Sequence, residues 1–231
     1  MDLRVYGEMI ALFLDSGYQV TSFQEIDGQK TEHRLILRHD VDVSVDCALQ
    51  MAQVEKELGV RSIYFFLLTS PLYNLLSKEA AKQVRAIHEL GHEIGLHFDP
   101  DAYPSDAFDH VQDELTTLVS FYPFANPIWI SFHRPGPKAG QLSELKLPGG
   151  IRHTYETQFF AGLAYFSDSR GSWGRGNPVD SEEFKQGKSM QVLTHPVWWV
   201  HEGQTPQEKL ERFVLTAGDC FRRMVVGEVF P

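Results

Sequence analysis

The stretch "LILRHDVDVS", residues 35–44, joins a short apolar run to a dense group of ionisable side chains. The apolar run is typical of a buried strand, and it is followed at once by Arg38, His39, Asp40 and Asp42. Because side chains alternate along a strand, we expect Asp40 and Asp42 on one side of it and His39 on the other. Two neighbouring carboxylates repel each other unless a cation or a proton lies beside them. The stretch therefore predicts a strand with reactive groups at its carboxyl end, and a pair of helix caps is the alternative.

The rest of the chain alternates strand-like and helix-like segments, without a repeat motif or a long linker. Such alternation predicts an α/β fold with a parallel sheet, either open or closed into a barrel. The length fits one domain, residues 1–231. We expect further strands within residues 61–70, 92–97, 128–133, 164–168 and 189–195, and helices within 1–17, 45–59, 77–91, 106–122 and 205–226.

Composition excludes several classes of protein. The net charge is −10 and the pI is about 5.4, which argues against nucleic acid as the main partner. No apolar run approaches the roughly 18 residues that a membrane span needs, and residues 1–17 indicate an amphipathic helix rather than a secretory signal. Two cysteines without a CxxC motif do not indicate a zinc knuckle or a redox centre. We expect a cytoplasmic protein of unspecified oligomeric state.

Polar residues recur at the carboxyl ends of the expected strands. In parallel α/β folds these ends share one face, where active sites form. Any one such residue could be a helix cap or a structural histidine, but five strands together predict a site. Mixed Asp and His ligands suit zinc or another divalent transition metal. The residues are Asp40 and Asp42, His97, His133 and Arg134, Asp168, and His195.

Five short motifs also occur in a characteristic order. With them the chain resembles the polysaccharide deacetylases with a NodB homology domain (carbohydrate esterase family four), in an atypical branch whose first motif is "RHDVD". The resemblance implies a distorted (β/α) barrel and the metal-dependent removal of an acetyl group from an N-acetylated sugar. The motifs are "RHDVD" (38–42), "GHEIGLHFDPD" (91–101), "FHRPGP" (132–137), "YFSDSRGSW" (165–173) and "VLTH" (192–195).

The resemblance also implies catalytic roles. Asp40 would be the general base that takes a proton from the attacking water. Arg134 would hold the Asp40 carboxylate. His195 would protonate the leaving amine, and Asp168 would orient a catalytic partner. Such chemistry needs a base on one side of the substrate and an acid on the other.

The metal ligands follow the family less closely. Asp42 and His97 match ligand positions, but Asp101 stands where the family has a second histidine. We expect His133 as the third ligand, with Asp99 and Asp101 as rivals. Zinc is the expected metal, and manganese, iron or magnesium become more suitable if two carboxylates bind.

Three residues are candidates for substrate binding. Arg170 lies close after Asp168 in the sequence and could bind a phosphate or nucleotide on the substrate, with a solvated loop as the alternative, and Trp173 lies in the same segment. Trp198, in "HPVWW", could form an aromatic wall for a sugar, although core packing is the alternative for a tryptophan. The expected substrate is a small molecule or a glycan of surface polysaccharide metabolism. Two other functions stay open: a carbohydrate-binding relative with a degenerate site, and a hydrolase of a non-sugar amide.

Overall fold

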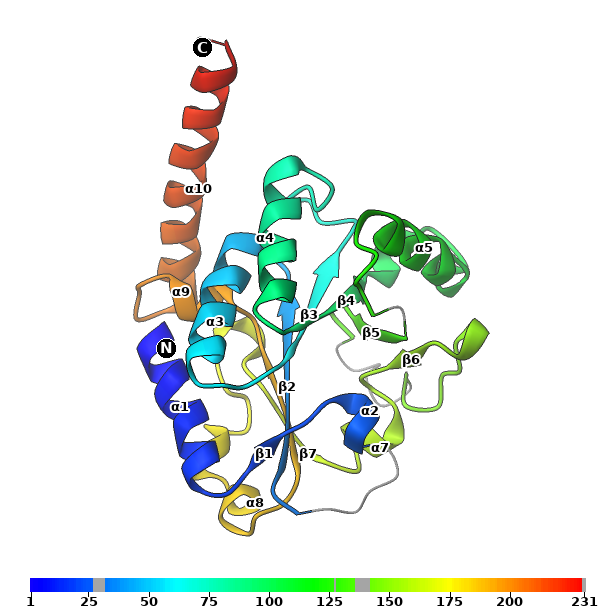
Figure 1. Cartoon of the computed structure of the whole chain (residues 1–231), viewed down its shortest axis with the longest axis vertical. Coiled ribbons are helices and arrows are strands. Elements are labelled where there is room, and N and C mark those ends of the chain that lie inside the picture. The colour runs from blue at the N-terminus through cyan, green and yellow to red at the C-terminus, as the bar shows by residue number, and fades with distance from the viewer. Residues whose placement is uncertain (27–31, 127, 136–141, 230–231) are drawn as a thin grey trace.

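The computed structural model describes residues 1–26, 32–126, 128–135 and 142–229, and its centre is a parallel sheet curled into a half-barrel with helices around it (Figure 1). This arrangement confirms the expected distorted (β/α) barrel. The strand order is β6-β5-β4-β3-β2-β8-β7, and β1 pairs with the start of β2. The strands are β1 (Gln19–Val20), β2 (Arg34–Val41), β3 (Ile63–Leu67), β4 (Glu93–Phe98), β5 (Trp129–Phe132), β6 (Arg152–His153), β7 (Ala164–Ser167) and β8 (Met190–Thr194).

Helices follow the strands much as the sequence predicted. Side-chain caps fix several helix starts: Asp2, Ser44 and Ser77 each accept a backbone N–H in the first turn that follows. None of the described helices is long and apolar enough to span a membrane. The helices are α1 (Leu3–Asp15), α2 (Phe23–Ile26), α3 (Val45–Glu57), α4 (Lys78–Glu89), α5 (Val111–Phe121), α7 (Thr157–Phe160), α8 (Glu182–Lys185), α9 (Val197–Val200) and α10 (Pro206–Val229), with 3₁₀ turns η1 (Pro100–Ala102), η2 (Ala107–His110), η4 (Pro148–Gly150), η5 (Ser169–Gly171) and η6 (Pro178–Asp180).

The two faces of β2 belong to different parts of the core. Ile36 packs with Phe65 and Trp129 inside the half-barrel, whereas Leu37 packs outward in the cluster that contains α1. Gly95 on β4 makes the inner packing possible, because a Cβ there would lie 2.5 Å from the Phe65 ring and 3.2 Å from the Trp129 carbonyl oxygen. Since side chains alternate, every second residue after Ile36 also faces the inside of the half-barrel.

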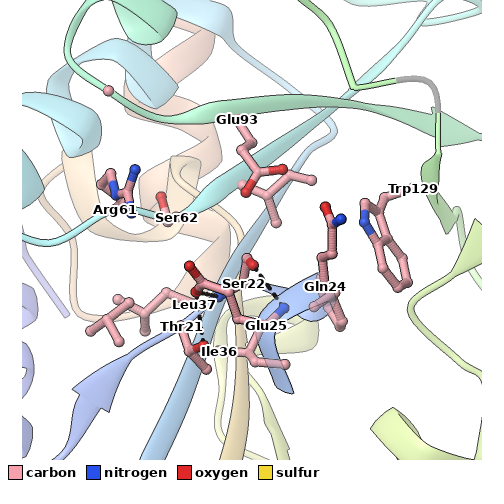
Figure 2. Close-up of a pocket in the computed structure, with 14 residues that line it drawn as sticks. Thr21, Ser22, Gln24, Glu25, Ile36, Leu37, Arg61, Ser62, Glu93 and Trp129 are labelled. Atoms are coloured by element: carbon pink, nitrogen blue, oxygen red, sulfur yellow. Dashed lines mark hydrogen bonds between the residues drawn. The ribbon is translucent and has the colours of Figure 1, made fainter. Parts of the chain in front are cut away.

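A cavity of about 460 Å³ lies at the amino ends of β3 and β4, where β1 and β3 border successive parts of β2 (Figure 2). Both carboxylates at its wall accept a hydrogen bond: Glu25 from Thr21 at 2.9 Å, and Glu93 from Asn126 at 2.8 Å. Because the cavity lies at the amino ends of β3 and β4, it is at the opposite end of the strands from Asp40 and is not part of the site that the motifs predict.

A fully buried carboxylate supports the outer face of β2. Glu55 on α3 accepts hydrogen bonds from Tyr6 (2.5 Å), Ser62 (2.7 Å) and Tyr64 (2.7 Å), and it lies 2.9 Å from His39 Nε2. Burial raises the pKa of Glu55, but the contacts with His39 and the other donors outweigh it, so the pKa falls to about 2. Glu55 thus joins α1, α3, β2 and the start of β3 in one network.

We predict that Glu55→Ala lowers the free energy of unfolding by about 3–5 kcal/mol at pH 7, because it leaves several buried donors without an acceptor. Urea denaturation measures this. Glu57→Ala, at an exposed position on the same helix, is the control and should change the free energy by less than about 0.5 kcal/mol.

The same network predicts a pH dependence. The folded pKa of Glu55 is about 2 against an ordinary 4.5, so between these values the unfolded chain binds more protons and stability falls as the pH falls. The parent should lose this contribution between about pH 4.5 and 2, and Glu55→Ala should lack that part of the loss. Equal urea midpoints for parent and variant at pH 7 would show that the network does not stabilise the fold.

Candidate metal and catalytic site

Four of the predicted site residues each come from the carboxyl end of a different strand. Asp42 directly follows β2, His97 is near the end of β4, His133 follows β5, and His195 follows β8. The register of β4 and β5 pairs His97 with Ser131, so His133 lies just beyond that pair. The curl of the sheet brings these ends together although β3 separates β2 from β4.

Three side chains converge on one point. His97 Nε2 lies 3.1 Å and His133 Nδ1 lies 3.4 Å from Asp42 Oδ1, and the two histidine nitrogens are 3.2 Å apart. One donor atom from each of the three residues lies within 4.8 Å of the other two. Imidazole nitrogen and carboxylate oxygen are the donors that zinc sites use.

The donor set has the features of a cation site. Asp42 Oδ1 is buried and lacks a hydrogen-bond partner among the described residues. His97 Nδ1 lies 3.1 Å from the Ser131 carbonyl oxygen, which orients the ring so that Nε2 faces Asp42, an outer contact typical of metal-bound histidines. Burial raises the pKa of Asp42, but His133 and His97 hold it well below its usual range. The three residues therefore fit a divalent metal.

Asp40 occupies the inside of the half-barrel beside this cluster. Its Oδ2 accepts hydrogen bonds from Arg38 at 3.0 Å and from Ser131 at 2.9 Å, and it lies 3.9 Å from His97 Nε2. Its Oδ1 is buried and has no hydrogen-bond partner in the described part of the chain. One carboxylate oxygen is thus fixed, and the other is available as an acceptor.

The cation beside Asp40 differs from the sequence prediction. We expected Arg134 to hold this carboxylate, but the Arg134 side chain is exposed and Arg38 takes the position. The reason is strand alternation: Arg38 lies two residues before Asp40 on β2 and faces the same side. Arg134 follows His133 in a loop and adopts a left-handed backbone with φ of 46°.

His195 is held by Asp168. The His195 Nδ1 lies 2.6 Å from Asp168 Oδ1, the His195 backbone N–H donates to the same carboxylate, and Trp199 Nε1 donates to Asp168 Oδ2 at 2.7 Å. Burial lowers the pKa of His195, but Asp168 raises it more, to about 9 overall. The His195 Nε2 lies 3.8 Å from Asp42 Oδ2, so this ring nitrogen faces the cluster.

Sequence reasoning missed three residues that support the site. They are Arg38, Ser131 and Trp199, and each has a signal in the sequence: Arg38 and Ser131 lie two residues before Asp40 and His133 on the same strand face, and Trp199 lies four residues after His195. Taking every second residue along a strand would have found Arg38 and Ser131, and stepping one helical turn beyond His195 would have found Trp199.

Other predicted residues lie elsewhere. Asp99 is the N-cap of η1 and accepts the Asp101 backbone N–H at 3.0 Å, and Asp101 is exposed. Neither belongs to the Asp42–His97–His133 group among the described residues. Arg170 is exposed and has a φ of 61°. Residues 136–141, which include the end of the "FHRPGP" motif, lie outside the described residues.

The two tryptophans proposed for substrate binding are partly buried. Trp173 and Trp198 both pack against the hydrophobic cluster that contains Trp199, and the rings of Trp173 and Trp199 are 6.1 Å apart. Core packing therefore accounts for part of each side chain, and a role in substrate binding stays a prediction.

Three solved structures have a chain path similar to that of this chain. They are a chitin deacetylase from Colletotrichum lindemuthianum (16% identity, 79% of this chain and 82% of that chain, TM-score 0.49), a deacetylase from Streptococcus pyogenes in complex with acetate (15%, 91% and 86%, 0.46) and the peptidoglycan N-acetylglucosamine deacetylase Bc1960 in complex with a hydroxamate-type benzamide (15%, 90% and 92%, 0.41). These neighbours are deacetylases. No protein-family model and no curated protein matches the sequence. At these identities the chemistry has to be argued from the site itself.

We predict that His133→Ala and His97→Ala each weaken zinc binding by more than the ~10–100-fold that loss of an outer hydrogen bond costs. Asp99→Asn and Asp101→Asn are the matched controls and should bind zinc as the parent does. Titration calorimetry of chelator-treated protein measures the affinity, and circular dichroism checks the fold. If Asp101→Asn loses zinc and His133→Ala keeps it, His133 is not the third ligand.

Proposed function

We propose that this chain is a metal-dependent hydrolase that removes an acyl group, in the simplest case acetyl, from the nitrogen of an amino sugar or of a sugar-linked precursor. One observation carries the proposal: Asp40, whose Oδ1 has no hydrogen-bond partner among the described residues, and His195, whose Nδ1 Asp168 engages, both lie beside the Asp42–His97–His133 cluster. Metal-assisted amide hydrolysis uses these three elements together, a metal, a base and an acid. The bound metal would act as a Lewis acid that lowers the pKa of water and polarises the amide carbonyl.

Asp40 is the proposed general base. Arg38 and Ser131 fix its Oδ2, so the unpaired Oδ1 has a defined direction in which to accept the proton of the attacking water. A base held in position loses little conformational freedom when it reacts, and this is what makes a positioned carboxylate effective.

His195 is the proposed general acid. Its Nδ1 is engaged by Asp168, which leaves Nε2 directed at the cluster and able to donate a proton to the leaving amine. An amine is a poor leaving group unless it is protonated, so the reaction requires an acid on this side of the substrate. Trp199 helps Asp168 to keep this orientation.

The sugar part of the proposal depends on the order of the five sequence motifs, because the three elements above would serve other amides as well. Turnover of a panel of N-acetylated amino sugars and non-sugar acetamides, with zinc supplied, tests it. Hydrolysis of the sugars supports the proposal. If only the non-sugar acetamides are hydrolysed, the proposed amino-sugar substrate class is wrong. If the sugars bind but are not hydrolysed, the carbohydrate-binding alternative is favoured.

We predict that Asp40→Asn keeps the metal and lowers turnover by ~10²–10⁴-fold, the usual worth of a general base. Asp42→Asn should instead lose the metal first, with activity partly restored by excess metal. Bound metal and turnover are measured for both variants. Identical behaviour of the two, or metal loss only in Asp40→Asn, would contradict the division between base and ligand.

We predict that His195→Gln is selective for poor leaving groups. It should lower hydrolysis of an N-acetylated amine by ~10²–10⁴-fold but affect hydrolysis of an activated aryl acetate much less, because a phenolate leaves without prior protonation. Asp168→Asn should show the same pattern more weakly. Equal losses on both substrates would mean that His195 does not act as the acid.

A further inference from the structure

The helix α10 exposes an unusual number of large apolar side chains. It projects from the body of the protein, and only its first part lies near other elements (Figure 1). Val214 is 63% exposed, Phe221 is 65% exposed and Met224 is 50% exposed. Single exposed apolar residues need no explanation, but a row of them along one helix marks an interaction surface.

Four of these exposed apolar side chains, together with the partly buried Ala217, follow a regular spacing. Leu210, Val214, Ala217, Phe221 and Met224, here called the α10 seam, are separated by four, three, four and three residues. This is the heptad spacing of helices that pack lengthwise against another helix. A helix of 24 residues is about 36 Å long, so the seam can pair over several turns.

The base of α10 is fixed to the body away from the seam. The buried Lys209 ammonium donates to the backbone oxygens of Trp198 at 2.6 Å and His201 at 3.0 Å, as well as to that of Met1. Phe213 is partly buried, and its ring lies 5.7 Å from that of His201. These contacts orient the helix, so the seam is left uncovered in the described part of the chain.

Charge along α10 indicates the partner. Glu211 lies near the start of the helix, and Arg222 lies eleven residues later, close to three turns, so both are on the same flank of the seam. When two identical helices pack antiparallel, the same flanks meet, and Glu211 of one faces Arg222 of the other. In a parallel pair, opposite flanks meet, and Glu211 would instead face the flank that carries Phe213 and Cys220.

We propose that the α10 seam is the surface on which two copies of this chain associate, with their α10 helices antiparallel. The antiparallel sense also places each helix N-terminus near the C-terminus of its partner, which the helix dipoles favour. The two-fold axis repeats the Glu211–Arg222 contact twice.

A membrane surface fits the seam less well. Amphipathic helices that bind lipid are rich in Lys and Arg on the polar face, whereas α10 has four basic residues and four acidic ones, and the whole chain carries a net charge of −10. The acidic residues are Glu208, Glu211, Asp219 and Glu228, and the basic residues are Lys209, Arg212, Arg222 and Arg223.

Sedimentation equilibrium of the full chain tests the proposal, with a reductant present so that the exposed Cys220 forms no disulfide. The parent should be a dimer, and the double variant Val214→Glu, Phe221→Glu should be a monomer at the same concentrations. Leu72→Glu, at a 55% exposed position outside α10, is the control and should leave the dimer intact. Circular dichroism and thermal unfolding report whether each variant folds.

Charge reversal tests the orientation with variants that alter only exposed side chains. Glu211→Arg should weaken the dimer by roughly tenfold, Arg222→Glu should do the same, and the combined variant should restore the affinity of the parent. The proposal is overturned by a parent that stays monomeric, by a dimer that the seam variant does not affect, by a combined variant that restores nothing, or by binding of the parent to vesicles of anionic lipid without self-association.

Discussion

The structure depends most on the buried ion pair of Arg38 and Asp40 inside the half-barrel. Both side chains are almost fully buried, and a charge in such a place costs several kcal/mol unless it is paired and hydrogen-bonded. The terminal nitrogens of the Arg38 guanidinium bond to Asp40, to Tyr155 at 3.1 Å and to Thr154. Burial lowers the pKa of Arg38, but Asp40 raises it more, so the cation persists. The pair therefore links β2 to the segment after β6.

The opposite face of β2 is supported by a second buried charge, the Glu55 carboxylate. His39 lies 2.9 Å from Glu55 and 2.7 Å from the Thr194 hydroxyl of β8. Because Thr194 directly precedes His195, this network positions the ends of the two strands that carry the proposed base and the proposed acid. Because side chains alternate along β2, Asp40 belongs to the network inside the half-barrel and His39 belongs to the network on the outer face. The carboxyl end of β2 is therefore held on both faces.

A strand end held in this way limits where the charges of the site can lie. Asp40 is fixed through one oxygen, and Asp42, one step beyond the strand, is half-exposed and close to His97. His195 is turned toward the same point by Asp168. The positions of the proposed base, of the three candidate metal donors and of the proposed acid follow from strand geometry and from contacts with residues outside these groups.

The amino-acid sequence by itself determined the α/β class, most element positions and the face on which the site lies. These follow from local periodicity and from the rule that parallel strands end on one side, as Asp42, His97 and His195 illustrate. The sequence also indicated that His39 faces away from Asp40, because alternation is a local property.

Tertiary structure decided which groups meet. Sequence spacing does not report that β2 and β5 approach across the curl of the sheet, so it favoured His133 without excluding Asp101, and it placed Arg134 beside Asp40, where the structure has Arg38. It also did not show that α10 leaves the body with its apolar seam uncovered. Which side chains contact each other in the site depends on the curvature of the sheet and on the compensation of buried charge, and both arise only when distant segments pack together.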